Sequence, residues 1–284
     1  MKQAAPADAL HIAALMNQSR KGWDAFVPVK PEEVEYNLKS EEAEIFLHGQ
    51  EALLEVYHHE NADRVICVYP YRHPEAPETL EDDLLVFAKE LCASRGLPLE
   101  MGLPHTRERE AERLRQHGLS YTRTFYRMVL EGEALAKIQP PVLQTGQGFR
   151  RITPLELTEM HNDAFQNHFG FYPMGVQQVE NWFGEHDFHP DDAQALCVNG
   201  KPVAFFAISK QDDGGHVYLL GTLQESQKQG YGGLTLRQGC ALLKARGVEK
   251  VNLAVDAENS HALEFYRRVG FEERFQNLRY RWSG

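Results

Sequence analysis

The sequence predicts an α/β protein made of two copies of one folding unit, and two observations support this prediction. First, segments in the two halves match each other at a nearly constant spacing, which is hard to obtain by chance. The matching pairs are residues 15–17 with 160–162, 26–28 with 171–173 and 34–35 with 179–180 at an offset of 145, then 95–97 with 246–248 at 151 and 117–119 with 269–271 at 152. Second, each half alternates short apolar, strand-like runs with apolar stripes at helical spacing.

The two copies are predicted to join between residues 132 and 148. Pro140-Pro141, Gly146 and Gly148 interrupt the periodicity in this stretch, as is typical of a connecting segment. We therefore expect an N-terminal domain over residues 1–140 and a C-terminal domain over residues 141–284. The drift of the offset from 145 to 152 corresponds to a few inserted loop residues, which protein surfaces tolerate.

The composition restricts the class of protein. A chain of 284 residues is long enough for two domains with their own cores. With 42% hydrophobic and 25% charged residues, it has the composition of an ordinary globular protein. The net charge is −11 and no tract is dense in Lys or Arg, which argues against nucleic acid or an anionic membrane as the main partner.

The cysteines and the chain start indicate a cytoplasmic location. Cys67, Cys92, Cys197 and Cys240 are scattered without metal or redox spacing, as in proteins of a reducing compartment. No apolar run approaches 18 residues, and the first residues lack the layout of a signal peptide. Neighbouring histidines occur at 58–59 and 186–189, but no third ligand follows at a helical spacing. We therefore expect no metal site and no membrane association.

A glycine-rich turn over residues 227–233 is the most informative segment. It follows the apolar run 217–220 and opens a helical stripe formed by Leu236, Cys240 and Leu243. A strand that ends in such a turn at a helix start presents free backbone N–H groups and the positive end of the helix dipole to an anion. The pattern is neither a Lys-Ser/Thr phosphate loop nor a dinucleotide-binding fingerprint. By itself it predicts a phosphate-binding turn or, equally, a tight turn without a ligand.

A second motif lies about 27 residues further along the chain. Residues 251–255 alternate as expected for a strand. The helix predicted after them begins at a capping Asn259 and ends at Gly270. Its apolar face comprises Ala262, Phe265, Tyr266 and Val269.

Together, the pattern Q-x-x-G-x-G from Gln227 and the pattern N-x-x-A-x-x-x-Y-x-x-x-G-F from Asn259 resemble the GNAT superfamily of acyl-CoA-dependent N-acyltransferases. The resemblance covers roughly residues 150–284. It implies an α+β type of α/β fold in which two tandem GNAT-like domains each have a mixed, mostly antiparallel sheet flanked by helices. It also implies acetyl-CoA as co-substrate and an amine-bearing acceptor as partner.

The same resemblance implies roles for individual residues. The turn would bind the CoA pyrophosphate through backbone amides, and the strand before it would hold the pantetheine arm as an added pseudo-strand. A backbone N–H there could stabilise the oxyanion of the tetrahedral intermediate. The residues concerned are Gln227, Lys228, Gln229, Gly230, Tyr231, Gly232 and Gly233 for the pyrophosphate, Leu220, Gly221 and Thr222 for the pantetheine, and Asn259 with Ala262 beside it.

Three residues are candidates for the proton transfers. By the same resemblance Tyr266 protonates the departing thiolate, a role open to a phenol that points at the sulfur. The alternative for Tyr266 is an aromatic on the buried face of its helix. Glu225 and Asp256 are the candidate bases for the attacking amine. Each of them is alternatively a solvated loop residue, as most exposed carboxylates are.

The N-terminal copy is expected to keep the scaffold without the two motifs. Residues 64–69 are predicted to form the strand that matches residues 217–222, and a helical apolar stripe follows. Between strand and helix, residues 70–78 contain three prolines and no glycine, so several N–H donors are missing. The Asn and Tyr of the second motif are absent as well. We interpret this half as a structural or substrate-shaping copy without CoA binding; a divergent second active site is the alternative.

Among GNAT relatives, the tandem arrangement resembles mycothiol synthases, which acetylate the cysteinyl amine of a sugar-linked thiol. Their acidic residue before the central strand and their aromatic residue in the next strand are replaced here by His216 and Ala254. The predicted function is N-acetyl transfer from acetyl-CoA to a primary amine of a small-molecule acceptor through the C-terminal domain. A non-catalytic acyl-CoA-binding or regulatory module is the alternative.

Overall fold

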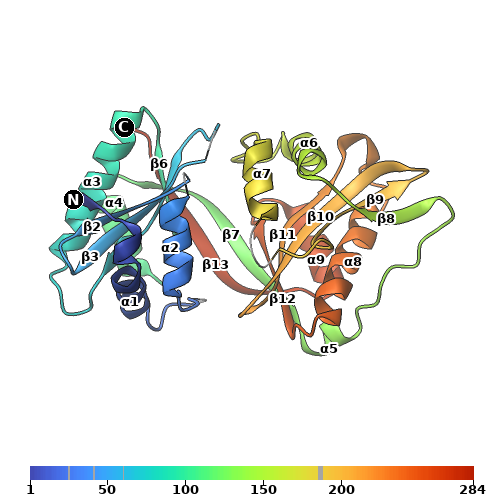
Figure 1. Ribbon diagram of the computed structural model, residues 1–284, viewed down its shortest axis with the longest axis horizontal. Coiled ribbons are helices and arrows are strands. Elements are labelled where there is room, and N and C mark those ends of the chain that lie inside the picture. Colours follow the sequence, from blue (N-terminus) through green and yellow to red (C-terminus); the bar gives the residue numbers. More distant parts are fainter. Residues whose placement is uncertain (25, 41, 60, 185–187) are drawn as a thin grey trace. The chain divides into compact units, whose positions relative to one another are not determined.

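The computed structural model describes residues 1–284 except 25, 41, 60 and 185–187. The chain divides into two compact units. Unit 1 comprises Met1–Phe125 and Phe275–Gly284, and unit 2 comprises Tyr126–Arg274. The chain enters unit 2 within strand β7 (Ser120–Glu131) and leaves it within strand β13 (Glu272–Trp282), so both chain ends belong to unit 1 (Figure 1).

Unit 1 is a mixed sheet with helices on both faces. Its helices are α1 (Ala9–Ser19), α2 (Pro31–Lys39), α3 (Thr79–Arg95) and α4 (Glu108–Gln116), preceded by the short 3-10 helix η1 (Pro6–Asp8). Its strands are β1 (Lys2–Gln3), β2 (Ala43–His48), β3 (Ala52–Tyr57), β4 (Val65–Val68), β5 (Tyr71–Arg72), β6 (Leu99–Pro104) and the last part of β13. The strand order is β1-β2-β3-β4-β6-β13, with β5 beside β3. β4 and β6 run parallel, whereas β2 with β3 and β6 with β13 run antiparallel.

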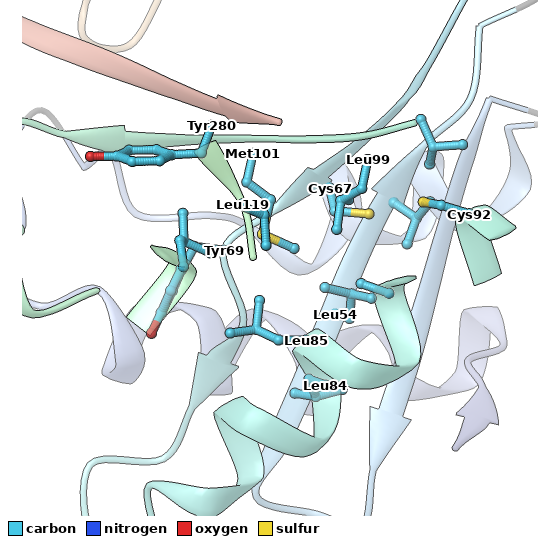
Figure 2. Packing of buried hydrophobic residues seen from close by; sticks show 14 of the residues in the cluster. Leu54, Cys67, Tyr69, Leu84, Leu85, Cys92, Leu99, Met101, Leu119 and Tyr280 are labelled. Atoms are coloured by element: carbon cyan, nitrogen blue, oxygen red, sulfur yellow. The ribbon is translucent and has the colours of Figure 1, made fainter. Parts of the chain in front are cut away.

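Each face of this sheet has its own hydrophobic core. Helices α1 and α2 pack Ile12, Met16 and Val34 against buried residues of β2 and β3. Helices α3 and α4 cover the opposite face. Figure 2 shows this second core, in which Leu84 and Leu85 of α3 share the interior with side chains of β3, β4 and β6. Tyr280 of β13 belongs to the same core and is almost fully buried.

Unit 2 has the same layered arrangement. Its helices are α5 (Gly132–Ala136), α6 (Pro154–Phe165), α7 (Val176–Phe183), α8 (Tyr231–Ala245) and α9 (Ser260–Val269), with the 3-10 helix η2 (Gln224–Ser226). Its strands are β8 (Gln147–Arg151), β9 (Ala193–Val198), β10 (Lys201–Gln211), β11 (Gly214–Thr222) and β12 (Lys250–Asp256), with the last part of β7. The strand order is β7-β12-β11-β10-β9-β8. β11 and β12 run parallel, whereas β10 with β11, β9 with β10 and β8 with β9 run antiparallel.

Two cores again lie on the two faces of the sheet. Helices α6 and α7 pack against Phe205 and Ala207 of β10. Helices α8 and α9 pack against Phe206 and Ile208, which are the alternate residues of the same strand. This alternation places neighbouring residues of β10 and β11 on opposite faces. It therefore decides which side chains can reach a ligand on the α6–α7 face.

The order of elements confirms the predicted tandem α/β fold. The series β2-β3-β4-α3-β6-α4 of unit 1 corresponds to β9-β10-β11-α8-β12-α9 of unit 2. In both units the strand before the long helix and the strand after it form a parallel pair. The last strand, however, is exchanged between the copies. β7, which follows α4, lies next to β12, whereas the end of β13, which follows α9, pairs with β6.

Candidate functional site

Strands β11 and β12 separate at the point where the sequence predicts the pantetheine arm. Their parallel pairing covers Gly215 with Val251 through Val217 with Leu253. β11 then continues to Thr222, paired with β10 on its other side. Within the described residues, the stretch 218–222 therefore has a sheet partner along one edge and none from β12. This leaves one edge of residues 220–222 open to an extended ligand, with Thr222 O accepting a long hydrogen bond from Gln227 Nε2 at 3.4 Å.

A β-bulge at Tyr218 accompanies this separation. Ala207 pairs with Leu219 and Ile208 pairs with Val217, so Tyr218 is the extra residue on β11. A bulge bends its strand and increases the local twist, which is the distortion required to turn β11 away from β12. Glycine is required further along, because a Cβ on Gly221 would lie 2.6 Å from Phe205 Cζ and 3.1 Å from Ala164 Cβ.

The glycine-rich turn, residues 227–233, forms the start of α8. Lys228 and Gly230 have positive φ angles of 62° and 82°, and Gly230 is the N-cap of the helix. Gly233 N–H donates to Gly230 O at 3.1 Å. Within the part of the chain that the structure describes, the N–H groups of residues 228–232 donate to no protein acceptor. The turn thus exposes several donors at the positive end of a 15-residue helix.

The glycines of this turn leave space above the backbone. A Cβ on Gly230 would have no heavy atom within 4 Å, so the residue is required for its left-handed conformation and not for close packing. Cβ atoms on Gly232 and Gly233 would meet only ordinary contacts, at 3.5 Å from Thr222 Oγ1 and 3.8 Å from Phe265 Cε2. A ligand can approach the free N–H groups from this side.

Helix α9 carries the second motif and begins and ends as predicted. The Asn259 side chain accepts a hydrogen bond from Ala262 N–H at 3.1 Å. Gly270 adopts a φ of 109°, and its N–H closes the helix on Arg267 O at 3.0 Å. Asn259 Oδ1 and Ala262 N–H are therefore paired with each other, which leaves the Asn259 amide nitrogen as the free donor of the pair.

Tyr266 lies on α9, half-buried against the α8–α9 core. Its ring contacts Phe265 and Phe271 at centroid distances of 5.2 and 5.8 Å. Burial raises the pKa of the Tyr266 hydroxyl to about 12, and the nearby Cys240 thiol contributes in the same direction. Among the described residues, no protein acceptor takes its proton. The side chain is thus both a packed aromatic and a protonated phenol with a free hydroxyl.

The two carboxylates predicted as bases have different surroundings. Glu225 is exposed in η2, directly before the glycine-rich turn. Asp256 ends β12 and shapes the turn that follows: its Oδ1 accepts from Glu258 N–H at 2.9 Å, and its carbonyl accepts from Asn259 N–H at 3.0 Å. Glu225 is therefore the freer of the two, whereas Asp256 supports the start of α9.

A third titratable cluster lies on β11 and was missed as a site in the sequence. His216 is 8% exposed. Its Nε2 lies 2.7 Å from Asp213 Oδ1, and its Nδ1 lies 3.4 Å from Arg127 Nη1. Because an arginine can only donate, Nδ1 accepts and the ring proton resides on Nε2. Burial lowers the pKa of His216 against the opposing hydrogen bond to Asp213, so a neutral ring is favoured. The spacing Asp213-x-x-His216 before an apolar strand was the available signal.

Aromatic rings adjoin this cluster on the α6–α7 face. The His216 ring stacks on Tyr218 at 5.8 Å, and Tyr218 in turn meets Trp182 of α7 edge-on at 5.9 Å. Tyr218 remains 48% exposed. The bulge therefore presents an accessible aromatic residue beside a buried histidine, next to the segment of β11 that has no partner from β12.

The corresponding turn of unit 1 has the opposite polarity. Between β4 and α3, Arg72 Nη1 lies within hydrogen-bonding distance of three carbonyl oxygens, those of His73, Pro74 and Ala76, at 2.9, 3.1 and 2.5 Å. Arg72 Nε also binds Glu81 at 3.0 Å. The turn thus directs carbonyl oxygens inward around a cation, where unit 2 presents N–H groups. The N–H groups of Arg72, His73, Glu75 and Ala76 in this turn already donate to protein acceptors.

Two further observations concern metals and membranes. Apart from the six residues outside the description, which include His186 and Asp187, no group of three or more His, Cys, Asp or Glu side chains is arranged to hold a metal ion. No helix in the described ranges combines the length and the apolar character needed to cross a bilayer. All four cysteines are free and buried.

Comparison with known proteins agrees with this geometry. The model of the acetyltransferase (GNAT) family matches residues 155–271. A mycothiol acetyltransferase of Clavibacter michiganensis subsp. michiganensis is 34% identical over 87 residues, which are 31% of this chain and 28% of the relative. Another mycothiol acetyltransferase, from Saccharomonospora viridis, is 27% identical over 230 residues, which are 79% of this chain and 66% of the relative. The chain therefore spans about a quarter to two thirds of the length of these relatives.

A solved structure shares the whole fold. The tandem GNAT protein from the clavulanic acid biosynthesis pathway superposes with a TM-score of 0.78 over 99% of this chain and 98% of its own, at 13% identity. At that identity the likeness concerns the fold alone. Residues 155–271 thus match the acetyltransferase (GNAT) family, within a tandem chain that resembles the mycothiol acetyltransferases.

Proposed function

We propose that unit 2 transfers an acetyl group from acetyl-CoA to a primary amine of a small-molecule acceptor. The observation that carries this proposal is the separation of β11 from β12 after Val217 and Leu253, with the glycine-rich turn at the end of the same β11. One edge of β11 is thus free for an extended thioester, and the free N–H groups of residues 228–232 follow directly for its pyrophosphate.

In this proposal, Gln227 to Gly233 bind the pyrophosphate and Leu220, Gly221 and Thr222 hold the pantetheine by backbone hydrogen bonds. The free amide nitrogen of Asn259 is placed at the start of α9 to bind a pantetheine carbonyl, and Ala262 keeps that side chain in position through its N–H. A backbone N–H of the unpaired segment of β11 stabilises the oxyanion. Unit 1, whose turn encloses Arg72, contributes no second CoA site.

The reaction forms one C–N bond and breaks one C–S bond. The neutral amine attacks the thioester carbonyl, the tetrahedral intermediate collapses, and the thiolate of CoA departs. Tyr266 supplies the proton to the sulfur, since its raised pKa keeps the phenol protonated at neutral pH. A base accepts the proton that the amine nitrogen loses, so the overall charge is conserved.

Three residues compete for the role of base. Glu225 is exposed beside the turn, Asp256 lies at the end of β12, and His216 lies on β11 before the bulge. We favour His216, because its ring is neutral near pH 7 and Asp213 holds the proton of Nε2, which leaves the Nδ1 lone pair to accept. Arg127, at 3.4 Å from Nδ1, would have to yield to the amine or to a bridging water.

The acceptor is proposed to bind on the α6–α7 face. Tyr218 and Trp182 provide an aromatic wall beside His216 there. The name of the mycothiol acetyltransferases makes thiol-bearing sugar conjugates with a free amine the first acceptors to test. The replacement of the acidic residue by His216 and of the aromatic residue by Ala254 argues for an acceptor that differs from theirs.

Turnover with a panel of primary amines tests the proposal. Loss of the thioester absorbance of acetyl-CoA is the suitable readout, because it is independent of thiols on the acceptor. Amine-dependent loss that disappears in Tyr266→Phe supports catalysis by unit 2. Tight acetyl-CoA binding without turnover by any amine would instead support a non-catalytic acyl-CoA-binding module.

A further inference from the structure

Unit 1 contains a pocket of about 290 Å³ at the end of its parallel strand pair. β4 and β6 pair from Val65 with Leu99 to Val68 with Gly102, after which the chain turns into β5, and β5 pairs with β3. Val68, Tyr69, Gly102 and Pro104 line the pocket where the strands separate. In the order of elements, this is the same place as the separation of β11 and β12 in unit 2. Unit 1 has thus kept an opening although it lacks the glycine-rich turn.

A buried arginine forms one wall of this pocket. Arg20 is 5% exposed. Its Nη2 donates to the carbonyls of Tyr69 and Pro70, the latter at 3.1 Å, and its Nη1 donates to Ser19 Oγ at 3.2 Å. A guanidinium has five N–H donors. Within the described residues Nη2 has two acceptors and Nη1 has one, so one N–H of Nη1 and the N–H of Nε are left for a ligand.

Arg20 lacks a direct counter-ion. Among the described residues, no carboxylate lies within ion-pair distance of its guanidinium. Two tyrosines beside it are bonded to carboxylates: the Tyr71 hydroxyl donates to Glu55 at 3.3 Å and the Tyr69 hydroxyl donates to Glu81 at 2.7 Å. Burial lowers the pKa of Arg20, and Tyr71, Tyr69, Glu81 and Glu110 oppose the shift only in part. A buried cation without a partner is costly in free energy.

The rings around Arg20 determine the direction from which a ligand can approach. The guanidinium carbon lies 4.0 Å from the ring centroids of both Trp23 and Tyr71. Stacked aromatics interact with the planar faces of a guanidinium. The free donors at its edge remain, and a carboxylate fits such an edge with in-plane hydrogen bonds.

We propose that this pocket of unit 1 binds a small carboxylate with an aromatic body, whose carboxyl group pairs with Arg20 and whose ring packs against Trp23, Phe26 and Tyr69. The single positive charge of Arg20 matches the single negative charge of a carboxylate. A phosphate dianion fits less well, because Asp24 also lines the pocket. A volume near 290 Å³ lies at the lower end of the range for small-molecule sites, which limits the ligand to about the size of one ring with a short chain.

Calorimetric titration of the full chain with 3-phenylpropanoate tests this proposal directly. The probe carries no amine, so it cannot serve as an acetyl acceptor in unit 2. We expect one site per chain, and binding at least about tenfold weaker for the neutral analogue 3-phenylpropan-1-ol, which cannot pair with the guanidinium. No binding of 3-phenylpropanoate, or equal affinity for acid and alcohol, would overturn the proposal.

Three variants locate the site. Arg20→Lys keeps the charge but loses the planar fork, and we expect at least about tenfold weaker binding of 3-phenylpropanoate. Trp23→Leu removes one aromatic wall and should weaken binding of 3-phenylpropanoate while the hydrogen bonds of Arg20 remain. This variant tests the location of the site if Arg20→Lys does not fold. Lys21→Met is the control: this exposed residue lines the adjoining pocket of about 410 Å³, to which Arg20 and Trp23 also belong, but not the pocket of about 290 Å³, and its substitution should leave the affinity unchanged. Unchanged affinity in Trp23→Leu, or an equal loss in Lys21→Met, would contradict the assignment.

Discussion

Asn162 and Met174 are joined by a reciprocal pair of hydrogen bonds. The Asn162 side-chain amide donates to Met174 O at 3.1 Å, and Met174 N–H donates to Asn162 Oδ1 at 2.9 Å. Asn17 and Val29 of unit 1 repeat the same pair at 2.9 and 2.8 Å. Both residues of the second pair lie 145 positions before those of the first. The repeat seen in the sequence is therefore also a repeat of individual interactions.

Removing either asparagine should destabilise its unit to a similar degree. Asn17→Ala and Asn162→Ala each lose two hydrogen bonds and leave a backbone N–H and C=O without partners, so we expect a loss of about 1–3 kcal/mol in the free energy of unfolding. Urea denaturation measures it. Asn181→Ala is the control, because Asn181 is exposed and its side chain accepts a hydrogen bond from the neighbouring Gln177 side chain at 3.1 Å. A loss no larger than that of the control would show that the reciprocal pair contributes nothing to stability.

Gly230→Asp should abolish acetyl-CoA binding while the fold survives. Its Cβ has open space around it, so the cost in folding is the left-handed backbone, about 1–2 kcal/mol. The carboxylate would repel the pyrophosphate at the helix start. Gly230→Asn has nearly the same shape without the charge and should retain much of the affinity. Calorimetry compares the two, and equal affinities would place the pyrophosphate elsewhere.

Tyr266→Phe should lower kcat by about 10²–10⁴-fold with little change in the KM for acetyl-CoA. The ring and its contacts with Phe265 and Phe271 remain, while the proton donor is lost. Steady-state kinetics under conditions limited by chemistry measure this effect. Tyr126→Phe, another tyrosine packed against the same core, is the matched control. If both variants turn over at the wild-type rate, Tyr266 has only a packing role.

His216 should make both stability and activity sensitive to acid. Its folded pKa lies below the ordinary 6.5, so the unfolded chain takes up the proton first. The stability contribution is therefore intact above pH 6.5 and is lost as the pH falls toward the folded pKa. Urea denaturation at pH 7 and pH 5 measures this change in the free energy of unfolding, and His216→Gln should remove the part that His216 contributes.

The same residue predicts the shape of the pH–rate profile. If His216 is the base, kcat/KM of the wild type falls on the acid side with an apparent pKa below 6.5, and His216→Gln loses both that limb and most of the rate. Glu225→Gln and Asp256→Asn should keep the limb. A limb that persists in His216→Gln and disappears in one of the carboxylate variants would assign the base to that carboxylate.

Acetyl-CoA should bind once per chain. Unit 2 has free N–H groups in its turn, whereas the corresponding turn of unit 1 encloses Arg72 with three carbonyls. Calorimetry with a non-transferable acetyl-CoA analogue should give a stoichiometry near one, and Gly230→Asp should reduce it to none. Two comparable sites would mean that unit 1 binds CoA in a way that does not use this turn.

The local elements of unit 2 could be predicted from sequence, because their signals are short in range. The strand–turn–helix around Gly230 and the helix from Asn259 to Gly270 follow from apolar periodicity, a cap and a left-handed end residue. The tandem fold followed from a spacing that loops can change by only a few residues. These features depend on residues that are close together in the chain, so a single sequence is sufficient to predict them.

The tertiary structure alone decided which partners meet across long separations. The exchange of β7 and β13 is one case, since the apolar pattern of a strand does not specify its partner, and here β7 lies next to β12 while β13 pairs with β6. The bulge at Tyr218 is another, because it depends on the register of β10. The contact of His216 with Arg127 and the enclosure of Arg20 by Trp23 and Tyr71 join residues from separate elements. The sequence by itself determined the repeated unit and its turns. The packing of side chains that are distant in the chain decided the strand pairings and the pockets, because the free energy of these arrangements depends on contacts that local patterns do not specify.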